Sequence, residues 1–383
     1  MNSRPSPGVM RLTAVHHRQN RDSHLFQCEI YDPAGNHLDL RYRVEPKIDG
    51  LVLDRADAFV LPCLLRAMKE GWNLQVDAPI SERLAANLPD IAFILSVQLA
   101  LIAPKAITCS SLLLATSNNK GAITGFSGGI DSFYTLKEFF FDCQFPGRKI
   151  TCLLHNQVGA NSAITDKGSY RRARRLAAEF GLPLIRVDSN IPSFLGMDYQ
   201  QTHTARNASV AYLFGSIASI FYYSSTDDYR HCGVFSTYDS AYTDPILLPL
   251  FSTPSMDMLS VGSRASRIEK TRALVDMPIV QRNLDVCANR RYQGEKINCS
   301  HCWKCMRTLL ALEAFGVIDR YGEVFDLDSY WRHRDAYLRY LQESKKPSER
   351  DVLQLAIQSR IAAIGARKPE LKEPAGTLAE RSQ

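Results

Sequence analysis

The sequence predicts an α/β fold, in which a doubly wound parallel sheet with a structural metal site follows a small α+β N-terminal domain. Strand-like and helix-like segments alternate between residues 122 and 187, as in a parallel sheet. A turn cluster, Asn118-Asn119-Lys120-Gly121, separates this region from a hairpin and helices before it. Four cysteines crowd into residues 287–305. The 383 residues allow two domains at roughly 150 residues each.

The composition is that of an ordinary soluble globular protein. Hydrophobic residues make up 45% of the chain and charged residues 22%, which excludes collagen-like, mucin-like and wholly disordered classes. The net charge of +6 is too small to indicate a nucleic-acid partner. The longest apolar runs, Ile91–Ala103 and Val210–Tyr223, are shorter than the roughly 20 residues that span a bilayer. Because Met1–Thr13 lacks an apolar signal region, we expect a cytoplasmic protein without membrane contact.

The sequence predicts that residues 1–118 form the α+β domain, whose role it does not reveal. Leu25–Val44 is typical of a hairpin around the turn Asp32-Pro33-Ala34-Gly35-Asn36. Ala56–Glu70 predicts a helix, and Ser81–Leu88 predicts a second helix that stops before Pro89.

The sequence predicts that residues 119–320 form the doubly wound domain. Its ligands should bind beyond the carboxyl ends of the strands. Asn207–Tyr223 is predicted to be an apolar helix. The sequence predicts that residues 321–365 form a helical extension and that the polar residues 366–383 form a disordered tail. The expected strands are Ala122–Phe126, Ile150–His155 and Leu184–Val187, with helices at Asp131–Phe141 and Lys167–Phe180 between them.

A glycine loop, Ser127-Gly128-Gly129-Ile130-Asp131-Ser132, joins the first of these strands to its helix. Two glycines let backbone amides turn inward as an anion-binding nest, and the helix N-terminus and serine hydroxyls favour a phosphate. A carboxylate beside phosphate needs an intervening cation, so we expect Asp131 to help hold Mg²⁺. The alternative is a tight turn in which Asp131 or Ser132 merely caps the helix.

The cysteine cluster has the spacing Cys287-x11-Cys299-x2-Cys302-x2-Cys305. Four thiolates close a tetrahedral zinc site and leave no open position, so we expect a structural Zn²⁺ site. An iron–sulfur cluster and reactive redox thiols are the alternatives that the spacing leaves open.

The loop matches the SGGxDS motif of the PP-loop ATP pyrophosphatases, which have an adenine nucleotide alpha hydrolase-like fold. Together with the cysteines about 160 residues later, it resembles the QueC family, the 7-cyano-7-deazaguanine synthases. The resemblance covers residues 120–316. Further positions that resemble motifs of the family are Arg206-Asn207, Tyr242-Thr243-Asp244, Ser266-Arg267-Ile268-Glu269 and Arg307.

The resemblance implies an ATP-dependent C–N ligase that releases pyrophosphate and AMP. The substrate would be the carboxylate of 7-carboxy-7-deazaguanine, activated as an acyl adenylate and attacked by ammonia to give an amide or, after a second activation, a nitrile. ATP would bind at Ser127, Gly128, Gly129, Asp131 and Ser132. Asp131, Lys270 and Arg206 would be catalytic, and Asn207, Asp244 and Arg267 would bind substrate. The alternatives are surface charges for Arg206, Arg267 and Lys270, and a turn-forming role for Asp244 before Pro245.

The chain departs from the family at Thr243 and Arg267, and it is longer at both ends. Longer QueC-like proteins look like members of antiphage-defence and nucleic-acid-modification gene clusters. This resemblance implies that the attacking amine would belong to a partner protein. An operon partner protein and a homodimer are both compatible with this interpretation. A PP-loop tRNA thiolase is one alternative, although Cys143 and Cys152 do not form a C-x2-C pair. An inactive ATP-binding sensor or scaffold is the other. Lys167, Arg171, Arg172, Arg174 and Arg175 predict a solvated helix face.

Overall fold

The computed structural model describes residues 8–114, 121–159, 167–289 and 291–361. The chain divides into two compact units, residues 1–285 and residues 286–383, which we call the sheet unit and the cysteine unit. The predicted disordered tail, residues 366–383, lies outside the described residues. None of the helices described is long and apolar enough to cross a membrane.

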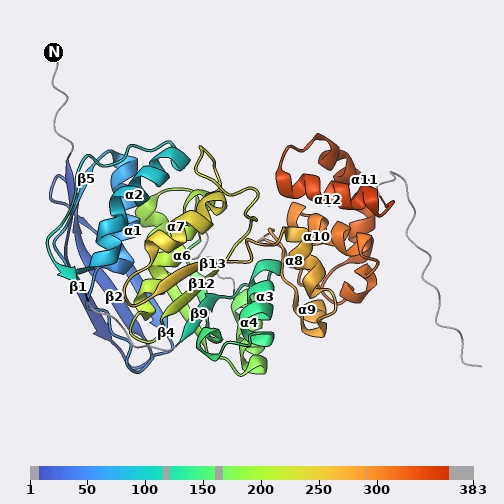
Figure 1. Ribbon diagram of the computed structural model, residues 1–383. Helices are drawn as coiled ribbons and strands as arrows, with labels where there is room; N and C mark the ends of the chain where they lie inside the picture. The colour runs from blue at the N-terminus through green and yellow to red at the C-terminus, as the bar shows by residue number, and fades with distance from the viewer. Residues whose placement is uncertain (1–7, 115–120, 160–166, 290, 362–383) are drawn as a thin grey trace, which may run out of the picture. The chain divides into compact units, whose positions relative to one another are not determined.

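An eleven-stranded sheet forms the sheet unit (Figure 1). Its main path runs β13-β12-β9-β10-β11-β4-β2-β1-β5-β7, and β3 pairs with β2. The five strands from β13 to β11 pair parallel with one another. The strands are β1 (Val9–Gln19), β2 (His24–Tyr31), β3 (His37–Leu38), β4 (Arg41–Glu45), β5 (Asn73–Val76), β7 (Ile107–Cys109), β9 (Ala122–Gly125), β10 (Ile150–Gln157), β11 (Leu184–Ser189), β12 (Ile220–Ser224) and β13 (Asp257–Val261); β6 (Ile80–Ser81) and β8 (Leu112–Leu113) pair separately.

The chain order of the parallel strands reverses at β9. From β9 the chain first adds β10 and β11 on one side, and then returns to add β12 and β13 on the other. Because crossovers are right-handed, helices before and after the reversal cover opposite faces of the sheet. The loops that follow β9 and β12 therefore diverge at the carboxyl ends of these strands, which is where open α/β sheets generally bind ligands. The predicted α/β class with its parallel sheet is confirmed.

Most of the N-terminal strands, β1 to β5 and β7, do not form a sheet of their own. Strand β4 pairs antiparallel with β11, with Val44 opposite Val187, so the N-terminal strands extend the parallel sheet. The predicted boundary at residue 118 lies outside the described residues, and the observed division falls at residue 285. Covering β11 with β4 removes an exposed strand edge. The sequence could not show this pairing, because about 140 residues separate the paired strands.

Two helix predictions are wrong in part. The helix predicted to stop before Pro89 continues to Leu99, and Pro89 lies inside it. The helix predicted over Asn207–Tyr223 ends at Ala211, and Ile220–Ser224 is strand β12 instead. Branched and aromatic residues in this run favour a buried strand as much as a helix, and the apolar run alone cannot separate the two.

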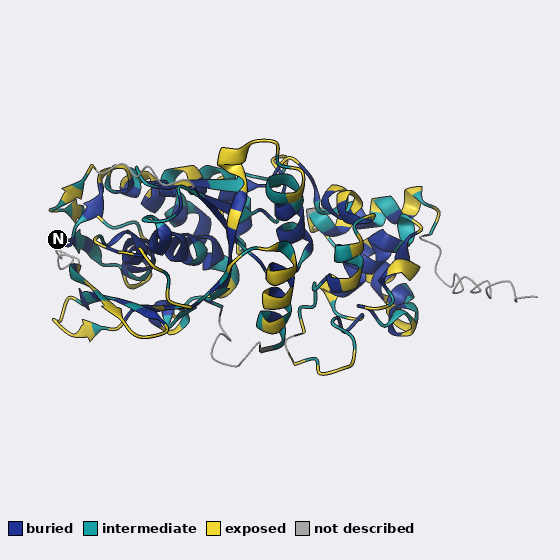
Figure 2. Ribbon diagram, turned by 90° about the horizontal axis from the view of Figure 1, so that it is seen from below, coloured by how far each residue is buried: buried dark blue, intermediate teal, exposed yellow. Residues whose placement is uncertain are grey.

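Helices cover the sheet, and burial is greatest along the sheet and on the helix sides that face it (Figure 2). Helices α1 and α6 pack together, as do α2 and α7, while α3 packs against α8. The helices of this unit are α1 (Asp57–Glu70), α2 (Glu82–Leu99), α3 (Ile130–Leu136), α4 (Lys167–Phe180), α5 (Ile191–Leu195), α6 (Tyr199–Ala211), α7 (Asp244–Phe251), α8 (Arg267–Leu274) and α9 (Pro278–Asn283), with a π-helical turn at Lys137–Phe141 and 3-10 turns at Pro146–Arg148, Tyr212–Phe214 and Ser240–Thr243.

The cysteine unit is mainly helical from Trp303 onward within the described residues. Helices α10 and α11 pack against α12, and Arg334 on α11 forms a buried ion pair with Glu313 on α10 at 2.8 Å. The predicted helical extension at 321–365 is thus part of this unit. Its elements are α10 (Trp303–Ala314), a 3-10 turn at Ile318–Tyr321, α11 (Leu327–Glu343) and α12 (Pro347–Gln358).

Candidate functional site

The glycine loop follows β9 directly and leads into α3. Gly128 has a φ of +77°, a left-handed conformation that a residue with a side chain rarely adopts. Gly129 is the N-cap of α3, and no side chain caps this helix. The hydroxyl of Ser132 donates to the Gly129 carbonyl at 3.0 Å rather than to a backbone amide. The amides of the first turn are therefore not used up by a capping side chain, and the alternative in which Asp131 or Ser132 caps the helix does not describe this structure.

Two cations meet Asp131 at the start of α3. An Arg267 guanidinium nitrogen lies 2.8 Å from Asp131 Oδ2, and Lys270 Nζ lies 3.6 Å from Asp131 Oδ1. Asp131 Oδ1 and Arg267 Nε are both buried without a hydrogen-bond partner among the described residues. A buried polar atom without a partner is rare in proteins, so these two atoms mark a place where a ligand would complete the bonding.

A capping box on α8 places these cations. Ser266 Oγ accepts from the Glu269 amide at 3.2 Å, and Glu269 Oε2 accepts from the Ser266 amide at 2.6 Å. This pattern fixes the first turn of the helix, which carries both Arg267 and Lys270. Cations at a helix N-terminus oppose the helix dipole, and here the Asp131 carboxylate offsets their charge.

Lys270 is completely buried. Its Nζ donates to the Ser225 carbonyl at 2.6 Å, just beyond the end of β12. A Cβ added to Gly262 would come within 3.0 Å of Lys270 Cε, so the glycine makes room for the lysine stem. Burial lowers the pKa of Lys270, and the ion pair with Asp131 acts in the opposite direction. The sequence-predicted residues Asp131, Arg267 and Lys270 are thus brought together at the ends of β9 and β12.

Arg206 and Asn207 are placed elsewhere. Arg206 is completely buried, and its nitrogens donate to Thr202 Oγ1 at 2.7 Å, the Val158 carbonyl at 2.8 Å and the Met197 carbonyl at 2.7 Å. The bond to Val158 ties α6 to the segment after β10, and the bond to Met197 ties it to the loop before α6. Burial lowers the pKa of Arg206. Asn207 accepts from Asn156 Nδ2 at 2.9 Å. The structure does not bring Arg206 into contact with Asp131, so its predicted catalytic role stays a prediction.

Asp244 is completely buried at the start of α7. Its Oδ1 accepts from Thr204 Oγ1 at 2.6 Å, while Oδ2 is buried without a hydrogen-bond partner among the described residues. Burial raises the pKa of Asp244 well above its usual value, and the negative charges of Asp239 and Asp227 act in the same direction. Asp244 thus lies in the first turn of α7 with one carboxylate oxygen bonded to Thr204, and its predicted substrate-binding role stays a prediction.

The structure adds a polar network that the sequence analysis missed. His203 Nδ1 lies 2.6 Å from the Tyr223 hydroxyl, and His203 Nε2 lies 3.2 Å from Asp239 Oδ1. Burial acts to raise the pKa of Asp239, but hydrogen bonds from His203 and others hold it below its usual value. Burial raises the pKa of Asp227, and Asp239 contributes to this shift. No local motif marks these residues, because they come from α6, β12 and two loops.

Replacing Asp244 by asparagine tests whether this carboxyl group is buried at a cost. The pKa of Asp244 in the folded state is raised above its usual value of 3.8. With respect to this group, the protein is therefore most stable below the unfolded-state pKa, where the carboxyl group is protonated in both states. Its free energy of unfolding falls as pH rises through the folded-state pKa, because the buried group must then carry a charge. We therefore expect Asp244→Asn to raise the melting temperature relative to wild type, with a gap that widens from pH 5 to pH 8. Exposed Asp90→Asn removes the same charge and serves as the control. A gap that does not change with pH would contradict the assignment.

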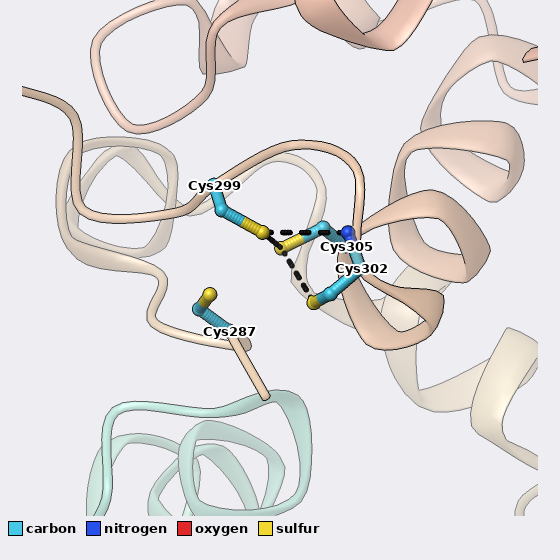
Figure 3. Close-up of side chains that lie close together, drawn as sticks. All are labelled: Cys287, Cys299, Cys302 and Cys305. Carbon is cyan, nitrogen blue, oxygen red and sulfur yellow. Dashed lines mark hydrogen bonds between the residues drawn. The ribbon is translucent and has the colours of Figure 1, made fainter. Parts of the chain in front are cut away.

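The four clustered cysteines converge in the cysteine unit (Figure 3). All four sulfur atoms lie within 4.8 Å of one another, and the sulfurs of Cys302 and Cys305 are 3.4 Å apart. Tetrahedral zinc with bonds of about 2.3 Å separates its sulfurs by about 3.8 Å, which lies within the observed range. Hydrogen bonds from Cys287 and Cys305 lower the pKa of Cys302, so the cluster favours a thiolate. The tetrad could hold a zinc ion.

The backbone around the tetrad is shaped for metal binding. Ser300, between two of the cysteines, has a φ of +64°, and this turn lets the Cys302 amide donate to Cys299 Sγ at 3.3 Å. The Ala288 amide donates to Cys302 Sγ at 3.3 Å. Such amide bonds orient and stabilise metal-bound thiolates. All ten cysteines are free, and the remaining six are Cys28, Cys63, Cys109, Cys143, Cys152 and Cys232.

Comparisons with known proteins give no relative for this chain: no family model, no curated protein and no solved structure matches it.

Proposed function

We propose that the protein uses ATP to adenylate a carboxylate and then transfers the acyl group to an amine. The observation that carries this proposal is the meeting of the glycine loop with Asp131, Arg267 and Lys270 where the strand order reverses. A nest of amides and two buried or half-buried cations at one point suit the phosphates of a nucleotide. The resemblance of the loop to the SGGxDS motif implies cleavage between the α and β phosphates, and the loop lacks the Gly-Lys-Ser/Thr pattern of a Walker loop.

The reaction has two steps whose bonds balance. A substrate carboxylate oxygen attacks the α phosphorus of ATP, the bond to the β-phosphate oxygen breaks, and pyrophosphate leaves. An amine then attacks the acyl carbon, the bond to AMP breaks, and the amine loses a proton. Charge grows on the phosphate oxygens in the first step, and preorganised amides and cations stabilise such charge most effectively. Arg267 and Lys270 supply the cations, and Asp131 fixes both of them in place.

The residues present also fit Mg²⁺. Mg²⁺ is usually bound by one or two carboxylates together with substrate phosphates, and the unpartnered Asp131 Oδ1 supplies one such ligand. When bound, Mg²⁺ would neutralise phosphate charge. Because Asp131 Oδ2 already pairs with Arg267, the carboxylate would hold the guanidinium with one oxygen and the metal with the other.

The substrate side lies toward Asp244 and its neighbours. A buried carboxyl group whose second oxygen has no partner suits a ligand with paired donors, such as the guanine-like edge of 7-carboxy-7-deazaguanine. We propose this compound as the carboxylate, and ammonia or an amine of a partner protein as the acceptor. A structural zinc ion held by Cys287, Cys299, Cys302 and Cys305 would stabilise the cysteine unit without taking part in the chemistry.

Burial acts against the thiolase alternative at two of the cysteines outside the tetrad. Burial raises the pKa of Cys152 to about 12 and that of Cys232 to about 11, so both thiols stay protonated near neutral pH. Sulfur transfer needs a thiolate as the nucleophile.

The test is incubation with ATP, Mg²⁺ and 7-carboxy-7-deazaguanine, with and without ammonium, followed by mass spectrometry. We expect AMP, pyrophosphate and an amide or nitrile of the base. AMP without a free base product would instead indicate a protein acceptor, which intact-protein mass spectrometry of the co-expressed partner would detect. A protein that binds ATP but forms no AMP with any carboxylate would contradict the ligase and favour the sensor or scaffold.

A further inference from the structure

Three side chains from separate elements of the sheet unit form a hydrogen-bonded chain, which we call the relay. Tyr223 lies on β12, His203 lies on α6, and Asp239 directly precedes the 3-10 turn at Ser240–Thr243. His203 Nδ1 lies 2.6 Å from the Tyr223 hydroxyl oxygen, and His203 Nε2 lies 3.2 Å from Asp239 Oδ1. A histidine that contacts a hydroxyl with one nitrogen and a carboxylate with the other has the arrangement of a base and its orienting group.

The hydrogen-bond partners fix the direction in which the relay can move a proton. Although burial acts in the opposite direction, hydrogen bonds from His203 and others hold the pKa of Asp239 below its usual value, so this carboxylate only accepts. A neutral His203 therefore carries its proton on Nε2 and has a lone pair on Nδ1. Thr204 Oγ1, 3.3 Å from Nδ1, donates to Asp244 instead. The Tyr223 hydroxyl is thus the group that donates to His203.

The relay ends where the candidate site begins. Tyr223 stands two residues before Ser225, whose carbonyl accepts from Lys270 Nζ at 2.6 Å. Between them, the Ser224 hydroxyl lies 2.8 Å from the hydroxyl of Thr135 on α3, the helix that follows the glycine loop. The relay and the buried lysine therefore both contact the carboxyl end of β12.

Charge divides this end of the sheet into two parts. Two cations surround Asp131, whereas carboxyl groups gather around the relay, namely Asp227, Asp239 and Asp244. Burial raises the pKa of Asp227 most, and the charges of Asp239 and Arg267 then act on it in opposite directions, so Asp227 lies within electrostatic reach of both parts. Carboxylates attract cations and repel phosphates. Because an amine is largely protonated near neutral pH, the relay side suits the amine.

We propose that Tyr223, His203 and Asp239 accept the proton of the amine that attacks the acyl adenylate. The inference rests on the proposed function, because it assigns the proton of the second step. The amine nitrogen bonds to the acyl carbon, and the bond to AMP breaks with its electron pair. The nitrogen gives a proton to the Tyr223 oxygen as the Tyr223 proton moves to His203 Nδ1, and the imidazolium pairs with Asp239. Tyr223 touches the amine, and the other two act through it as positioning residues.

The test compares ammonium with hydroxylamine on the full-length, metal-loaded protein with ATP and 7-carboxy-7-deazaguanine. Mass spectrometry measures the amide from ammonium and the hydroxamate from hydroxylamine. Hydroxylamine is largely uncharged near neutral pH and loses its proton readily to water after attack, so it needs no base on the protein. We expect Tyr223→Phe and His203→Gln to lower amide formation about 100-fold or more, and hydroxamate formation less than about twofold, because only the former needs a general base.

Tyr222→Phe is the matched control. It removes a hydroxyl from the neighbouring position of β12, where the group donates to the Arg148 carbonyl at 2.9 Å. Successive side chains of a strand point to opposite faces of the sheet, so this hydroxyl lies away from the relay. The control should form both products at nearly the wild-type rate.

Equal loss of amide and hydroxamate in Tyr223→Phe would overturn the relay, because a role in folding or in carboxylate activation would then explain both. Unchanged amide formation in Tyr223→Phe and His203→Gln would also refute the relay but keep the proposed function. A wild type that forms neither product would instead refute the proposed function. Nitrogen NMR of the His203 ring, assigned with His203→Gln, needs no activity: we expect the Nε2–H tautomer, and the Nδ1–H tautomer would contradict the relay.

Discussion

Replacing Asp131 by asparagine is expected to lower the rate of AMP formation by about 100- to 1,000-fold, the loss seen when one preorganised electrostatic group is removed. The amide cannot neutralise Arg267 and Lys270, which then repel each other at the start of α8. It is also a poor Mg²⁺ ligand. Single-turnover measurement of AMP, with saturating ATP and carboxylate, separates this loss from weaker substrate binding.

Asp142→Asn is the control for this experiment. It removes the same charge just after the π-helical turn that follows α3, where the exposed Asp142 pairs with Lys137. Exposed ion pairs contribute little to stability, so the control should keep nearly full activity. If both variants lose activity equally, Asp131 does not have the electrostatic role we assign to it. Equal melting temperatures of Asp131→Asn and wild type would exclude a folding defect.

Replacing Cys305 by serine is expected to remove the metal and unfold the cysteine unit. Cys305 is completely buried and lies close to two other sulfur atoms of the tetrad. A structural zinc ion contributes on the order of 10 kcal/mol to the folding of small metal-binding domains, so a three-sulfur site should not keep this unit folded. Elemental analysis should give about one zinc per wild-type chain and far less in the variant. Hydrogen exchange should report lost protection in α10 to α12, while β9 to β13 stay protected.

Cys143→Ser is the matched control, since Cys143 is a free cysteine of intermediate burial outside the tetrad. It should keep its metal and its protection pattern. Iron with visible absorbance in the wild type would contradict zinc and favour a cluster, although four sulfurs within 4.8 Å leave room for one ion rather than for several irons with bridging sulfides. Unchanged metal content in Cys305→Ser would show that this sulfur is not a ligand.

The local parts of the candidate site could be predicted from the sequence, since the information that sets them is local. The strand, glycine loop and helix around Gly128 form a short continuous segment whose backbone demands are written in its residue types. The Cys-x2-Cys-x2-Cys spacing places three thiols on one turn and one helix start. The segment Ser266-Arg267-Ile268-Glu269 is also local, because Ser266 and Glu269 form a capping box that starts α8.

Residues that meet only through the tertiary fold could not be placed in this way. Arg206 was predicted to be catalytic, but nothing in its neighbours reveals that carbonyls at Val158 and Met197 surround it. His203 and Asp239 lie 36 residues apart and meet only because α6 packs beside β12 and the 3-10 turn at Ser240–Thr243. The sequence predicts that the polar face of α4 is solvated, and only the tertiary fold brings Arg172 to the Asp285 carboxylate.

By itself, the sequence determined the α/β class, the loop and the cysteine tetrad, because glycines, hydrophobic periodicity and ligand spacing act over a few residues. The tertiary structure decided the rest. It merged the N-terminal strands with the parallel sheet through β4 and β11, and it set Arg267 and Lys270 against Asp131. These contacts depend on strand pairing and helix packing between distant segments, where the free energy of burial, and not the local sequence, selects the partners.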